Sequence, residues 1–99
     1  MPAVTRIGDA DVVHCSGMTR AVGSGNVFVN GIGVSRQDDN NTGHLLPGAP
    51  CPGHSAPITI GSKTVFVNSK GTGRIGDAIT GCTSVAQGST NVFAGGWYK

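Results

Sequence analysis

One short pattern recurs three times along this 99-residue chain, and each copy contains one of its only three phenylalanines. The copies occupy residues 23–31, 61–69 and 88–96, and each begins Gly-Ser and continues, after two variable residues, with Val-Phe and a Val or Ala. A second motif precedes each copy, as Arg6-Ile7-Gly8-Asp9, Arg36-Gln37-Asp38-Asp39 and Arg74-Ile75-Gly76-Asp77. Self-similarity of this kind is typical of a fold built from structural repeats. We therefore interpret the chain as one domain, residues 1–99, with repeats at approximately 4–31, 34–69 and 72–96.

The repeats are unequally spaced, so insertions separate their equivalent strands. The longest insertion, 42–57, contains four of the five prolines. Proline lacks the backbone N–H that a helix or an inner strand requires. The whole insertion is therefore expected to be loop.

Composition favours β structure. The chain has 17 glycines and 11 valines but only two leucines and no glutamate, so the strongest helix formers are nearly missing. Each repeat is expected to contain a short strand at its start (Val4–Ile7 in the first), a Gly-Asp turn and the Val-Phe strand. A single hairpin this short is unstable alone, so we expect an all-β domain of three pseudo-threefold β-hairpin repeats packed about a common axis.

Several function classes are disfavoured. Seven Lys and Arg residues against five acidic ones, without a basic run, do not suit a nucleic-acid binder. No apolar stretch reaches the length of a membrane span, and the start of the chain lacks the apolar core of a signal peptide. The Gly-x-Gly-x-x-Gly at 71–76 is followed by no helical pattern, and no Gly-x-Ser-x-Gly exists. We expect a protein that is not an enzyme and has no small-molecule substrate.

A metal-ligating residue type follows each repeat arginine at the same offset of eight positions: His14 after Arg6, His44 after Arg36 and Cys82 after Arg74. Equivalent positions of three repeats around an axis converge, so these side chains can meet. Structural zinc is almost always four-coordinate, and His54 is the one remaining histidine. The predicted ligands are therefore His14, His44, His54 and Cys82. Zinc is favoured and iron is the alternative, and with four protein ligands the metal would be structural.

Two further cysteines leave alternatives open. Either Cys15 or Cys51 could replace His54 as the fourth ligand, or the two could form a disulfide. The odd total of three cysteines argues mildly against a complete disulfide framework, so both are interpreted as thiols.

The segment Pro2-Ala3-Val4-Thr5-Arg6-Ile7-Gly8-Asp9 resembles the signature of the PAAR-repeat family, named for a Pro-Ala-Ala-Arg motif, although Val4-Thr5 replaces the inner residues. The later Gly-Ser-Asn-Val-Phe pattern strengthens the resemblance, which extends to about residue 96; the second repeat departs from the motif. Members of that family are small cones with a three-His, one-Cys metal site near the tip, here implying His14, His44, His54 and Cys82.

The resemblance also implies a function. Family members cap trimeric β-helical spikes in phage tails and type VI secretion systems, so one chain is expected per spike trimer. The expected role is to sharpen the spike for piercing a target envelope when the tail or sheath contracts. The location would be the tail tip of a virion, or the bacterial cytoplasm before delivery by a secretion apparatus. Because the chain ends soon after its last repeat, we expect a cap without an effector domain.

Two other interpretations stay open. The chain could be a stand-alone metal-binding or redox module that uses Cys15 and Cys51 and has no spike partner. It could also be a small hydrolase with Cys82 as nucleophile and His14 or His44 as base, which requires an accessible thiolate. The role of Trp97 and the choice between phage and secretion system are left open by the sequence.

Overall fold

A computed structural model of the chain describes residues 2–13, 17–45 and 53–95. The regular elements in these ranges are all short β-strands, which confirms the all-β prediction. They are β1 (Phe28–Val29), β2 (Ile32–Gly33), β3 (His44–Leu45), β4 (Gly53–His54), β5 (Phe66–Val67) and β6 (Lys70–Gly71). No helix in these ranges is long and apolar enough to cross a membrane.

The hairpins β1–β2 and β5–β6 are equivalent, and both are antiparallel. Asn30 and Gly31 join the first pair with φ values of 55° and 75°, and Asn68 and Ser69 join the second with 53° and 67°. Two consecutive residues with positive φ are typical of the type I′ turn, whose twist matches that of the strands. Two of the three Val-Phe segments therefore enter tight hairpins, each with the residues that follow it, whereas Phe93 of the third copy bridges to Ala3.

The insertion 42–57 is not entirely loop, so that part of the prediction is wrong. β3 and β4 lie inside it and form an antiparallel pair. Strand pairing is possible here because the four prolines lie outside the paired residues His44, Leu45, Gly53 and His54. Proline interrupts a ladder only at its own position.

Bridges between distant segments tie the chain together in a closed cycle. Arg6 pairs with Val34, Arg36 pairs with Thr72, and Arg74 pairs with Val4. Each bridge joins a repeat arginine to the residue two positions before the next arginine in the cycle. The start of each repeat, predicted as a strand, is therefore bridged to neighbouring segments rather than paired in a continuous ladder.

A second cycle of bridges lies further along each repeat. Arg20 pairs with Asn41, Ile58 pairs with Ile79, and Val85 pairs with Asp11. All six side chains are buried, with at most 3% of each residue exposed. We call these residues the six-residue layer. Three of its members, Asp11, Arg20 and Asn41, are polar, whereas Ile58, Ile79 and Val85 are apolar and belong to one core cluster with Ala56.

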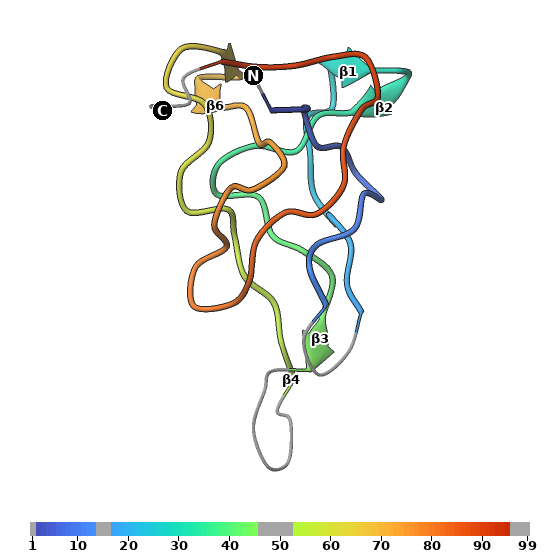
Figure 1. Ribbon diagram of the computed structural model, residues 1–99, viewed down its shortest axis with the longest axis vertical. Helices are drawn as coiled ribbons and strands as arrows, with labels where there is room; N and C mark the ends of the chain where they lie inside the picture. The colour runs from blue at the N-terminus through green and yellow to red at the C-terminus, as the bar shows by residue number, and fades with distance from the viewer. Residues whose placement is uncertain (1, 14–16, 46–52, 96–99) are drawn as a thin grey trace.

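The other core cluster consists of Val4, Val34, Val67 and Ala94, with Val29 and Val92 packed against it. Figure 1 shows the two ends of the molecule: β1, β2 and β6 lie at one end with the segment that leads to residue 95, and β3 and β4 lie at the other. We call these the broad end and the narrow end.

Candidate metal centre

Three hairpin-like loops carry the predicted ligands. They are closed by equivalent bridges, Ala10 to Thr19, Asn40 to Pro57 and Ala78 to Ser84. In the sequence, His14 lies within the first loop, His44 and His54 lie within the second, and Cys82 lies within the third. His14, Cys15, Cys51 and Trp97 lie outside the described residues.

The histidines at 44 and 54 are brought together by the backbone. β3 and β4 pair so that the Cα atoms of His44 and His54 are directly opposite each other. Directly opposed residues of an antiparallel pair are close neighbours. Spacing in the sequence gave no sign of this pairing, because it depends on the register of two strands inside a proline-rich insertion. The pair lies at the narrow end of the molecule (Figure 1).

Cys82 is the predicted ligand whose side chain is described. It is a half-buried thiol that is not part of a disulfide, and it packs against the apolar cluster of Ile58, Ile79 and Val85. Burial raises the pKa of the Cys82 thiol; the hydrogen bond from Asn41 opposes that rise, and the charge of Asp11 adds to it. The described neighbours of Cys82 therefore favour the neutral thiol, whereas a nucleophile and a metal ligand both require the thiolate.

A buried polar cluster adjoins this thiol, and sequence reasoning missed it. Arg20 Nη1 lies 3.3 Å from Asp11 Oδ2, and both side chains are fully buried. Asn41 Nδ2 donates to Asp11 Oδ2 at 3.1 Å and lies 4.0 Å from Cys82 Sγ. Burial lowers the pKa of Arg20, against the opposing effect of Asp11. Alignment of the repeats could have revealed the cluster, because polar residues stand where other repeats have Ile or Val.

The chemistry of the donor set suits zinc, which accepts thiolate and imidazole ligands. Backbone placement is compatible with such a site, since the Cα atoms of His44 and His54 are directly opposite each other and Asn41, near the base of the same loop, lies 4.0 Å from Cys82 Sγ. Among the described side chains, no three His, Cys, Asp or Glu residues form a metal-binding group. Whether the four predicted ligands converge therefore stays a prediction.

The repeat arginines form ion pairs with the aspartates of their own turns. In each Arg-x-x-Asp turn the carboxylate accepts the arginine backbone N–H at 2.8 Å and is paired with the guanidinium through two further hydrogen bonds. The pairs are Arg6 with Asp9, Arg36 with Asp39 and Arg74 with Asp77. The carboxylates therefore stabilise turns by capping nearby backbone, as aspartate commonly does.

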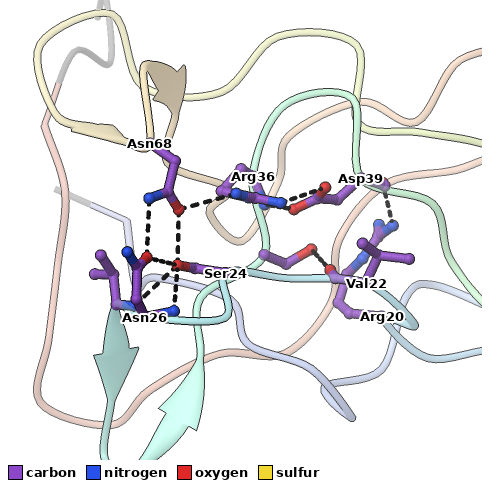
Figure 2. Close-up of polar contacts among 9 residues, drawn as sticks. Arg20, Val22, Ser24, Asn26, Arg36, Asp39 and Asn68 are labelled. Atoms are coloured by element: carbon purple, nitrogen blue, oxygen red, sulfur yellow. Dashed lines mark hydrogen bonds and ion pairs between the residues drawn. The ribbon is translucent and has the colours of Figure 1, made fainter.

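Asn68 connects the turn of Arg36 and Asp39 to Ser24 in the first repeat (Figure 2). Its Oδ1 accepts from Arg36 Nη1 at 2.9 Å and from Ser24 Oγ at 2.7 Å, while its Nδ2 donates to Asn26 Oδ1 at 2.9 Å. Asn30 has the same arrangement with Arg6, Ser89 and Asn91. Each asparagine thus joins the arginine of its own repeat to the serine of a neighbouring one.

The third junction uses a backbone carbonyl instead. Gly95 stands where the other repeats have asparagine, and its carbonyl oxygen accepts from Arg74 Nη1 and Ser62 Oγ, both at 2.6 Å. A second position of the junction also differs: Thr64 stands where the other two repeats have Asn26 and Asn91. In the other two junctions the asparagine amide donates to this second asparagine. Gly95 has no side-chain amide to donate, so Thr64 at the second position agrees with glycine at the first.

The three phenylalanines are exposed. Phe28, Phe66 and Phe93 have 57%, 60% and 50% of their surface in contact with solvent. They occupy equivalent positions of the three repeats, in segments at the broad end (Figure 1). Contiguous exposed apolar surface often marks an interaction site, so these three rings are candidates for one.

Comparison with protein-family models gave no match, and comparison with curated proteins gave none either.

Proposed function

We propose that this protein is a spike-tip cap: a cone of three pseudo-threefold repeats whose broad end binds the end of a trimeric β-helical spike. One observation carries the proposal. A single chain has three equivalent, exposed phenylalanines, Phe28, Phe66 and Phe93, in segments at the broad end (Figure 1). The resemblance of residues 2–9 to the PAAR signature agrees with it.

The symmetry of the contacts supports one chain per trimer. Both cycles of bridges pass once through each repeat, the Arg-Asp turns recur in all three repeats, and the asparagine junctions recur in two of them. A partner with three identical subunits can therefore make three similar contacts with one chain. Each phenylalanine would contact one subunit and cover strand edges that a blunt β-helix leaves unpaired.

A metal at the narrow end would complete the cap. His14, His44, His54 and Cys82 would hold it, with zinc as the favoured ion. When bound, it cross-links the three loops where few side chains remain to pack. The role of the chain is then mechanical, since a rigid tip concentrates the force of a contracting tail on a small area of envelope.

The binding test uses the β-helical spike trimer of the organism that encodes this chain. Native mass spectrometry is expected to show one chain per trimer. The triple variant Phe28→Ser, Phe66→Ser and Phe93→Ser should lose the complex. Val13→Ser, at a residue that is 68% exposed but is not one of these phenylalanines, should keep it.

A wild-type chain that forms no complex would contradict the cap. That outcome would favour the stand-alone metal-binding or redox module. A complex that persists in the triple variant would show that a different surface makes the contact.

A further inference from the structure

Asn41 is a buried carboxamide, only 2% exposed, that touches three different segments. Its Oδ1 accepts the backbone N–H of Ala56 at 2.9 Å. Its Nδ2 donates to Asp11 Oδ2 at 3.1 Å and faces Cys82 Sγ at 4.0 Å. One side chain therefore links all three of the loops that carry the predicted ligands.

The neighbours determine which way the amide points. The N–H of Ala56 can only donate and the carboxylate of Asp11 accepts, so the oxygen must face Ala56 and the nitrogen must face Asp11. The same nitrogen faces Cys82, and its second hydrogen is available for sulfur. Cys82 is thus presented with a donor, which stabilises a sulfur that carries negative charge more than a neutral one.

Packing alone does not require asparagine here. Asp11 and Ile79 occupy the equivalent positions of the six-residue layer, and Ile79 is as deeply buried with an apolar side chain. A β-branched apolar residue is therefore compatible with this position of the repeat. What it would lack is the pair of donors toward Asp11 and Cys82 and the acceptor for Ala56.

We infer that Asn41 is the positioning residue of the metal centre proposed above: it orients Cys82 Sγ as a thiolate ligand and holds the segment that leads from His54. Hydrogen bonds from outer-shell residues to metal ligands set their orientation and commonly change metal affinity by about 10- to 100-fold. This inference rests on the proposed metal site and would be wrong without it.

The test compares Co(II) binding by the wild type, Asn41→Val and a matched control, Val34→Ala. Val34 is equally buried but belongs to the core cluster that does not include Cys82. We expect Asn41→Val to bind Co(II) about tenfold or more weakly and to shift the thiolate-to-cobalt absorption band. Val34→Ala should lower the melting temperature while leaving the affinity and the band unchanged.

The outcomes are distinguishable. If Asn41→Val keeps the wild-type affinity and band, the role of Asn41 is wrong and the metal site stands. If the wild type itself binds Co(II) without a thiolate band, or not at all, the proposed site is wrong and the inference falls with it.

A measurement on the wild type covers the case in which Asn41→Val does not fold. With the protein loaded with an NMR-active cadmium isotope, a hydrogen bond to the ligating sulfur produces scalar coupling between cadmium and an Asn41 side-chain amide proton. Detection of that coupling is the expected result, and its absence in a cadmium-thiolate complex would overturn the inference.

Discussion

Arg20 and Asp11 form an ion pair in which both side chains are fully removed from solvent, with Nη1 3.3 Å from Oδ2. The pair lies in a layer whose other repeats supply Ile58, Ile79 and Val85. Arg20 also donates from Nη2 to the carbonyl of Asp39 at 2.9 Å, so it bridges two repeats (Figure 2). In the six-residue layer, Asp11, Arg20 and Asn41 are thus held by polar contacts, whereas Ile58, Ile79 and Val85 pack as an apolar cluster.

Removing one partner of this pair should be strongly destabilising. Arg20→Ala leaves the carboxylate of Asp11 buried without its counter-charge, and we expect the free energy of unfolding to fall by about 3–5 kcal/mol. Urea unfolding measures it. The double variant Arg20→Val and Asp11→Ile, which introduces the residue types of Val85 and Ile79, should lose less than the two single changes together. Additive losses would contradict a coupled pair.

Removing the Ser24 hydroxyl should lower the free energy of unfolding, although the side chain is small. Its Oγ accepts the backbone N–H groups of Asn26 and Val27 at 3.2 and 2.9 Å and donates to Asn68. Ser24→Ala removes the acceptor of two part-buried backbone N–H groups and one donor to Asn68, so we expect a loss of about 1–3 kcal/mol in thermal or urea unfolding. Thr90→Ala, at an exposed position, serves as control and should change stability by about 0.5 kcal/mol or less.

Gly61 is required by a close approach of two backbone segments. A Cβ there would overlap the carbonyl group of Gly71, so Gly61→Ala must displace backbone. We expect a loss of stability of about 1–3 kcal/mol, the usual cost of overpacking. Gly25→Ala should be tolerated, since a Cβ there meets no atom within 4 Å. Equal melting temperatures for the two variants would contradict the close approach.

The metal-free protein should lose stability in alkaline solution through Cys82. Burial raises the pKa of this thiol above its ordinary 9.0, so the fold favours the protonated form. The contribution of Cys82 is fully present below the unfolded-state pKa and is lost as the pH rises through the folded-state value. The free energy of unfolding should therefore fall faster with rising pH in the wild type than in Cys82→Ala. Parallel curves would contradict the direction of this shift.

The exposed phenylalanines should contribute little to folding. Because at least half of the surface of each one is in solvent, Phe28→Ser, Phe66→Ser or Phe93→Ser should each cost less than about 1 kcal/mol in urea unfolding. A larger loss in any one of them would show that its ring serves the core, and would weaken the proposal that these residues bind a partner.

Much of the local structure was predictable from the sequence. The recurring motif predicted a turn in each repeat, and the structure has these turns, with Asp9, Asp39 and Asp77 accepting backbone N–H groups. The common offset of His14, His44 and Cys82 predicts equivalent positions; each lies, by its place in the sequence, within one of the bridged loops, and their convergence stays a prediction. These features depend on residues a few positions apart, whose preferences act before any long-range contact forms.

The register of pairing was decided by the tertiary structure. The asparagine junctions and the contact of Asn41 with Asp11 join different repeats. The opposition of His44 and His54 and the buried pair of Arg20 and Asp11 join residues across a loop, nine or ten positions apart. No local pattern encodes such contacts, because they arise when the cycle of bridges closes. Closure then determines which polar groups lose water and must find partners inside the protein.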